Sequence, residues 1–137
     1  MKIKLDPGAY LPTRAHPTDA GLDIRAMESG AIPAHSGRTF RTGVHVEIPS
    51  GCCGVLVSKS GLNVNCDLTS TGLIDEGYTG EIMVKLYNHA NWPYLISQGE
   101  KISQLVILPC RYEEVELVDE IFGGERGDAG FGSTGRD

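Results

Sequence analysis

A glycine pattern near the C-terminus has residue types that could bind phosphate. Residues 130–135 of GFGSTGRD fit G-x-G-x-x-G, which binds dinucleotides when a strand precedes it and a helix follows it. Only two residues follow the last glycine here, so we do not expect that βαβ unit. Arg126, Ser133 and Thr134 nevertheless stand among backbone amides that suit a phosphate chain, and Phe131 could stack on a base.

A second group of candidates lies in TGLIDEGYTGEIMVKLYN (71–88), which predicts a strand, a turn and a second strand. Asp75 ends the first predicted strand and Tyr78 follows three residues later. A carboxylate in a hairpin turn is usually only a solvated turn residue. Met83, however, stands on a face that otherwise carries Glu81 and Lys85, and a pocket rimmed by this hairpin would explain it.

Two shorter stretches offer polar groups suited to an anion and its counterion. SKSGL (58–62) follows the predicted strand GVLVS with a lysine, two hydroxyls and a glycine. DAGLDIRA (19–26) places Asp19 and Asp23 four residues apart, too sparse for a calcium loop but sufficient to hold a hydrated magnesium ion.

Alternation of apolar and polar residues indicates the elements that must position these groups. We expect many short strands in a compact sandwich or barrel, with at most a helical turn near SGLNV. Gly and Pro punctuate nearly every gap between the alternating segments. The predicted strands include residues 3–5, 44–48, 82–86, 102–108 and 114–118.

Length, charge and composition limit the class of protein. At 137 residues with net charge −6, the chain predicts one domain without a broad footprint for duplex nucleic acid. We see no signal peptide and no apolar run near the roughly 18 residues that span a bilayer, so a cytoplasmic protein is expected. The spacing of the four cysteines and four histidines does not favour a zinc site. Composition changes at about Gly123, which predicts a domain over 1–122 and a flexible glycine-rich tail over 123–137.

Taken in order, AGLDI, SKSGL, GLIDEGYTGE, GEKISQL and RGDAGFGSTG resemble the five motifs of the trimeric dUTP diphosphatases (dUTPases). The resemblance runs from about Asp19 to the last residue. It implies an all-β distorted jelly roll of the β-clip type in a homotrimer, with active sites shared between subunits. It also implies Mg²⁺-dependent hydrolysis of dUTP to dUMP and pyrophosphate, which limits uracil in DNA and supplies dUMP for thymidylate synthesis.

The same resemblance implies roles for the hairpin residues. Asp75 would activate the attacking water and contact the deoxyribose 3′-hydroxyl, and Tyr78 would exclude a 2′-hydroxyl. The uracil would be held by the hairpin, with Leu73 and Met83 at its pocket. Thr69, also assigned to substrate binding, stands where many bacterial members have a base-reading asparagine.

The remaining motifs would hold the triphosphate. Asp23 would bind a water on Mg²⁺, while the body of the protein would contact phosphates through Lys59, Ser60, Gly61 and Gln104. Lys59 and Lys101 stand where the family usually has arginine, so bidentate contacts become point charges. The tail over 123–137 would act as a lid that covers the nucleotide with Arg126, Phe131, Gly132, Ser133 and Thr134.

Two alternatives remain beside the dUTPase interpretation. A dCTP deaminase of the same fold would need a glutamate where this chain has Lys85, which argues against deamination. A nucleotide-gated binding protein is the second alternative, because some phage-borne relatives also bind regulatory proteins through the active-site face.

Overall fold

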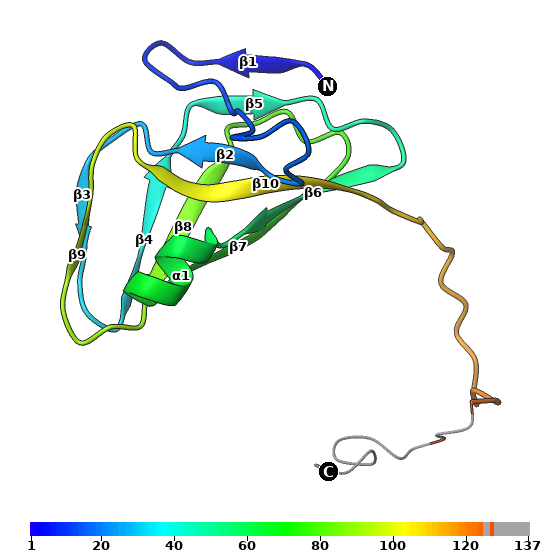
Figure 1. The fold of residues 1–137 in the computed structure, drawn as a ribbon. Helices are drawn as coiled ribbons and strands as arrows, with labels where there is room; N and C mark the ends of the chain where they lie inside the picture. The colour runs from blue at the N-terminus through cyan, green and yellow to red at the C-terminus, as the bar shows by residue number, and fades with distance from the viewer. Residues whose placement is uncertain (125–126, 128–137) are drawn as a thin grey trace.

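The computed structural model describes residues 1–124 and 127 of the chain. It contains one short helix and ten strands (Figure 1). In chain order these are β1 (Ile3–Leu5), β2 (Leu22–Arg25), β3 (Gly30–Ile32), β4 (Ser36–Arg41), β5 (Val44–Val46), β6 (Cys52–Val57), α1 (Ser60–Cys66), β7 (Leu68–Ile74), β8 (Met83–Asn88), β9 (Tyr94–Ile96) and β10 (Lys101–Pro109).

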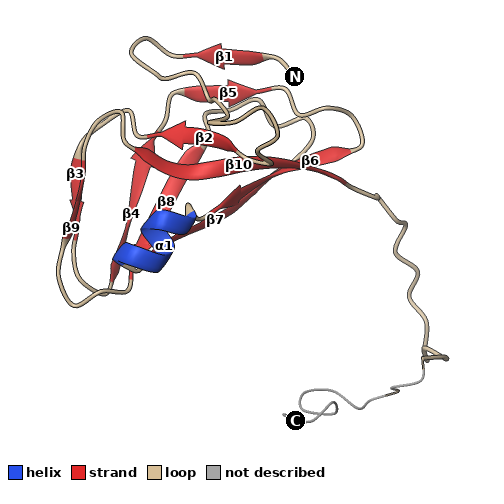
Figure 2. Ribbon diagram, in the orientation of Figure 1, coloured by secondary structure: helices blue, strands red, loops and turns tan. Residues whose placement is uncertain are grey.

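The strands form three antiparallel sheets (Figure 2). The largest has the order β2-β10-β6-β7-β8-β4, so strands far apart in sequence become neighbours. Two smaller sheets, β1-β5 and β3-β9, lie at its margins. The predicted all-β class is confirmed, and the crossovers explain why residues from widely separated motifs can share one region.

The predicted alternation places apolar side chains in one core. Val44 and Val46 of β5 are buried, and so are Ile82, Val84 and Leu86 around β8. Between them, Met83 and Lys85 are exposed. The β8 face that carries Met83 is therefore free to line a ligand site, as the pattern predicts.

The helical turn expected near SGLNV is a helix of seven residues. It ends at Asp67, whose φ of 53° is left-handed. No residue of α1 is fully buried, but Leu62 and Cys66 pack against the core. The helix thus bridges β6 and β7 at one end of their ladder (Figure 1).

The strand predicted over 114–118 is wrong. Within the described part of the chain, these residues pair with nothing, and Val115 and Leu117 are each 98% exposed. Alternation marks a segment able to form a strand, but a strand also needs a partner, and this single chain offers none there. Beyond β10 the chain runs away from the folded body (Figure 1).

Among the described residues, no helix is long and apolar enough to cross a membrane. All four cysteines are free and partly buried.

Candidate active site

The hairpin β7–β8 opens into a gap near its turn. The two strands pair only from Leu68–Ser70 to Leu86–Asn88. Beyond that point, in the described chain, β7 pairs with β6 and β8 pairs with β4. The inner edges of both strands therefore face each other without a shared ladder, which leaves room and main-chain polar groups for a ligand.

The turn that closes this hairpin is fixed by one glycine. The backbone N–H of Tyr78 donates to the carbonyl of Asp75 at 3.2 Å, and Gly77 between them has φ of +86°. A positive φ at the third turn position is typical of a type II turn, which favours glycine there. Asp75 thus lies at the end of β7, and Tyr78 begins the return of the chain.

A cavity of about 360 Å³ occupies the open part of the hairpin. Its lining includes Leu73, Asp75, Tyr78 and Met83, which we call the hairpin cluster. Ile74 and Glu81 complete the lining. The structure therefore brings together four residues that the sequence assigned to catalysis, sugar and base, around a space of the size of a small ligand.

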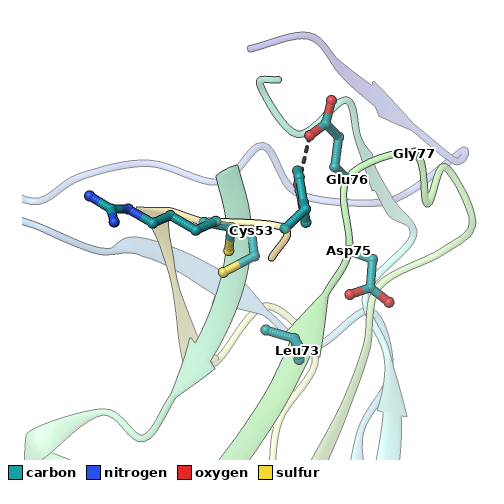
Figure 3. A pocket seen from close by; sticks show the side chains of 8 residues that line it. Cys53, Leu73, Asp75, Glu76 and Gly77 are labelled. Atoms are coloured by element: carbon teal, nitrogen blue, oxygen red, sulfur yellow. Dashed lines mark hydrogen bonds between the residues drawn. The ribbon is translucent and has the colours of Figure 1, made fainter. Parts of the chain in front are cut away.

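A larger hollow of about 770 Å³ shares Leu73 and Asp75 with this cavity. Figure 3 shows Asp75 and Glu76 pointing away from each other at its rim. Tyr112 donates its hydroxyl to Glu76 at 2.7 Å, and this hydrogen bond raises the pKa of Tyr112 to about 12. The start of the exposed C-terminal segment is thereby fastened to the turn that carries Asp75.

Two thiols line the same hollow. A hydrogen bond with Cys53 raises the pKa of Cys110, as does partial burial. Cys110 lies just past β10, and its N–H donates to the carbonyl of Gly51 at 2.8 Å. These contacts hold the chain just past β10 beside the candidate site.

The predicted metal and phosphate residues form a second group, the lysine cluster, which comprises Asp23, Lys59, Lys101 and Gln104. Asp23 is 3% exposed, and the ammonium groups of Lys59 and Lys101 each lie 2.6 Å from one of its oxygens. Gln104 donates to the same carboxylate at 3.4 Å. Lys101 of the GEKISQL motif was noted from the sequence as a lysine in place of the family's usual arginine.

The charge balance of the lysine cluster decides the ionisation of Asp23. Burial acts to raise the pKa of this carboxyl, but the hydrogen bonds and charges of Lys101 and Lys59 outweigh burial, so its pKa lies below the ordinary value. One buried carboxylate thus holds two lysines, and one positive charge is left over for an anion.

The other predicted phosphate residues lie next to this cluster. Ser60 and Gly61 begin α1 directly after Lys59. A Cβ at Gly61 would meet nothing within 4 Å, so this backbone faces open space. An anion held by Lys59 would therefore be close to Ser60 and Gly61 in the chain.

Thr69 lies outside the hairpin cluster. It pairs with Tyr87 at the closed end of the hairpin, and its hydroxyl is 2.8 Å from Nε2 of His89. Its assignment to substrate binding stays a prediction.

The hairpin cluster and the lysine cluster stand at opposite ends of the β6–β7 ladder. Ile74 pairs with Gly54, which places Asp75 beside Cys53, whereas Lys59 follows Val57 at the far end. At about 3.3 Å per residue, the six steps from Cys53 to Lys59 amount to a separation on the order of 20 Å. One chain therefore does not bring Asp75 and Lys59 to the same phosphate.

Sequence reasoning missed an ionic network behind the hairpin. Arg41 contacts both carboxylate oxygens of Glu81, at 3.2 and 3.1 Å, and reaches Asp6 at 3.3 Å. Glu81 had been noted only as a member of a polar face. Asp6, Arg41 and Glu81 are far apart in the sequence, so their spacing does not reveal these contacts.

The predicted lid residues Arg126, Phe131, Gly132, Ser133 and Thr134 lie outside the described residues. Among the residues that are described, no group of three or more His, Cys, Asp or Glu side chains could hold a metal ion.

Comparison with known proteins agrees with this geometry. The family model for dUTPase matches residues 8–135. Deoxyuridine 5′-triphosphate nucleotidohydrolase from Gloeothece citriformis is 40% identical, with 98% of this chain and 97% of that protein aligned. The enzyme of the same name from Anaplasma marginale is 41% identical over 98% of this chain and 95% of its own.

Solved structures give the same result. A point mutant of the dUTPase of Staphylococcus bacteriophage 80alpha, solved with dUpNHpp, is 32% identical and superimposes with a TM-score of 0.91, covering 98% of this chain and 97% of that one. A point mutant of the dUTPase from S. aureus phage phi11, described with a structural Mg(II) ion, is 31% identical with a TM-score of 0.80, covering 87% of this chain and 96% of that one. The fold is thus the jelly roll of these enzymes, and the chain belongs to the dUTPase family.

Proposed function

We propose that this dUTPase hydrolyses dUTP to dUMP and pyrophosphate in a Mg²⁺-dependent reaction, at sites that subunits of a homotrimer share. The observation that carries the proposal is the opened hairpin, whose cavity is lined by Leu73, Asp75, Tyr78 and Met83. The relative from bacteriophage 80alpha was solved with a dUTP analogue, so a uracil nucleotide is the natural ligand to consider here.

The base and sugar would enter the gap between β7 and β8. Main-chain groups at the unpaired strand edges can read a planar base edge, while Leu73 and Met83 supply apolar walls. Tyr78 is 46% exposed at the cavity. Its ring would occupy the space that a ribose 2′-hydroxyl needs, which favours deoxyribose.

Asp75 would act as the general base. Its carboxylate lies at the cavity and at the larger hollow beside it, so one edge can face the sugar while water approaches from the other. Hydrolysis of a phosphoanhydride needs an in-line water and an acceptor for its proton. The proton would pass from the attacking water to the Asp75 carboxylate as the water oxygen bonds to the α-phosphorus. The bond from that phosphorus to the oxygen bridging to the β-phosphate would break, and pyrophosphate would leave.

The triphosphate would be received by the lysine cluster of another subunit. Lys59 and Lys101 surround Asp23 with an excess of one positive charge, and Gln104 adds a neutral donor. This cluster stands on the order of 20 Å from Asp75 along the ladder. A complete site therefore needs residues of at least two copies. The expectation of three subunits rests on the resemblance to the trimeric dUTPases.

The exposed segment after β10 supports assembly. Val115 and Leu117 are each 98% exposed, and Ile121 and Phe122 are 90% and 86% exposed. An extended segment with this much uncovered apolar surface is typical of an arm that packs on another subunit. The lid residues from 123 onward would then reach a neighbour's nucleotide.

Magnesium would arrive with the triphosphate. Both oxygens of Asp23 are already engaged by lysines, so this residue fits a contact with a metal-bound water better than direct ligation. When bound, the ion would neutralise phosphate charge and polarise the phosphorus that water attacks. Lys59, Lys101 and Gln104 would orient the phosphates in either case.

The test measures pyrophosphate release from dUTP, dCTP, dTTP and UTP, with and without a chelator, for the wild type and Asp75→Asn. We expect dUTP to be preferred, the chelator to stop turnover, and Asp75→Asn to bind dUTP but turn over about 10²–10⁴-fold more slowly. Ammonia release from dCTP would instead identify a deaminase, and dUTP binding without turnover would identify a nucleotide-gated binding protein.

A further inference from the structure

One carboxylate behind the active-site hairpin holds three consecutive residues of a neighbouring turn. The Glu81 oxygen Oε1 accepts from the N–H of Gly43 at 2.8 Å and from the N–H of Thr42 at 3.2 Å. Nε of Arg41 donates to both oxygens at 3.2 and 3.1 Å. The Glu81 side chain is 19% exposed, so these contacts are largely shielded from water.

The turn that receives Glu81 has little freedom to follow it. Gly43 has φ of +64°, and a Cβ there would lie 2.6 Å from Cβ of Ala9, which packing forbids. The Asp6 carboxylate contacts Arg41 at 3.3 Å and Nε2 of His45 at 3.2 Å. The N-terminal loop therefore braces the same turn from behind.

The backbone of Glu81 contacts the predicted sugar-binding residue. Its carbonyl accepts from the Tyr78 hydroxyl at 3.0 Å. The Tyr78 ring also lies so close to Gly80 that a Cβ at Gly80 would collide with the hydroxyl. The position of the ring is thus set by the backbone of Gly80 and Glu81.

Flanking bonds hold the rest of this segment. Nδ1 of His45 donates to the carbonyl of Thr79 at 2.9 Å, and the N–H of Ile82 donates to the carbonyl of Val44 at 2.8 Å. Glu81 lies between these two bonds. Its side chain is the contact that ties the stretch touching Tyr78 to the rigid turn at Gly43.

We propose that Glu81 is a positioning residue for sugar discrimination, because it holds Tyr78 at the cavity through its carboxylate bonds to the Arg41–Gly43 turn. The proposal rests on the proposed function of Tyr78 in excluding a 2′-hydroxyl. Loss of the carboxylate would let the Tyr78 ring move and leave room for a ribose.

The main variant is Glu81→Gln. Its amide oxygen can still accept from Gly43, but its amide N–H₂ would face the Arg41 guanidinium, so that contact is lost. Arg41→Met removes the other partner at a half-exposed side chain, which serves if Glu81→Gln fails to fold. Lys2→Met is the matched control, because it breaks an exposed ion pair with Glu47 on the neighbouring β1–β5 sheet.

The first measurement reports the ring without depending on catalysis. The five tyrosines are replaced by 3-fluorotyrosine, and Tyr78→Phe assigns the ¹⁹F resonance of Tyr78. We expect Glu81→Gln and Arg41→Met to shift or broaden this resonance more than the other four, and Lys2→Met to leave it in place. An unchanged Tyr78 resonance in both folded variants would overturn the proposal.

The second measurement reports specificity. Glu81→Gln should lower the ratio of kcat/KM for dUTP to kcat/KM for UTP by about five-fold or more, chiefly by raising kcat/KM for UTP. If Glu81 acts through Tyr78, it should change the ratio less than about two-fold in a Tyr78→Ala background. An equal effect in both backgrounds would overturn the proposal. A wild type without dUTP hydrolysis would refute the proposed function, and the ¹⁹F result would still decide the positioning role.

Discussion

Two inactive variants of this chain should restore each other when their subunits are mixed. Asp75→Asn damages the hairpin cluster, and Lys59→Met damages the lysine cluster. Lys59→Met leaves Lys101 at 2.6 Å from the buried Asp23, so this carboxylate keeps a counterion. Each variant alone should be weak, by about 10²–10⁴-fold for the base and roughly 10–100-fold for a charge-assisted phosphate contact.

The expected recovery follows from the separation of the two clusters. They stand on the order of 20 Å apart along the β6–β7 ladder, so in the proposed homotrimer a site would take Asp75 from one subunit and Lys59 from another. In trimers assembled at random from equal amounts of the two variants, a site has an intact hairpin cluster with a probability of one half. It has an intact lysine cluster with the same probability. About one quarter of the sites should therefore be fully active.

The assay denatures the two variants together, refolds them, and follows pyrophosphate release from dUTP per site. The control mixes Asp75→Asn with Tyr78→Ala, which damage the same hairpin. Every hairpin in that mixture carries a lesion, so the mixture should show no gain over the average of its two parents.

Recovery of about a quarter of wild-type activity would support a shared site. If Asp75→Asn and Lys59→Met gave no more activity than the average of the separate variants, although mixed oligomers form, the two clusters would serve sites within one chain. The interpretation of the 20 Å separation would then be wrong.

Three further outcomes are expected. Tyr78→Ala should lower the ratio of dUTP to UTP hydrolysis by relaxing sugar exclusion, whereas an equal fall in both rates would make Tyr78 a packing residue. Ending the chain after Gly124 should leave the Tm nearly unchanged, because the removed residues contain one large apolar side chain, yet lower kcat/KM by about 10²-fold or more; full activity would refute the lid. The pKa of Asp23 is lower in the folded state than its ordinary value, so its ionised form stabilises the fold. The stability that wild type gains over Asp23→Asn should therefore be complete above the ordinary carboxyl pKa of about 3.9 and disappear as pH falls through the lower folded pKa. Urea midpoints of both proteins from pH 7 to pH 3 measure this difference.

The strands and the hairpin could be predicted because their signal is local. Ile82, Val84 and Leu86 alternate with polar residues and are all buried, and EGYTG supplies the glycine that the turn requires. The segment 114–118 carries the same alternation and forms no strand. Its pattern records a preference, but pairing depends on a partner that a single chain does not provide.

The candidate site could be predicted by residue type but not by arrangement. The motifs named Asp23, Lys59 and Asp75, yet no spacing reveals that Lys59 and Lys101 share the Asp23 carboxylate. The opening of the hairpin could not be predicted from the sequence either. It depends on which strands pair with β7 and β8 beyond Ser70 and Leu86. Contacts of this kind are settled by the order of strands in the sheet.

The exposed segment after β10 has a further property that concerns solubility. Its apolar residues are interleaved with acids at Glu113, Glu114, Glu116, Asp119 and Glu120. Two such segments laid side by side would bring like charges together, which disfavours edge-to-edge growth into fibres. The same segment can still lie on an uncharged surface through Val115 and Leu117. Its acids thus disfavour pairing between two copies of the segment, while its exposed apolar side chains can still pack on a different surface.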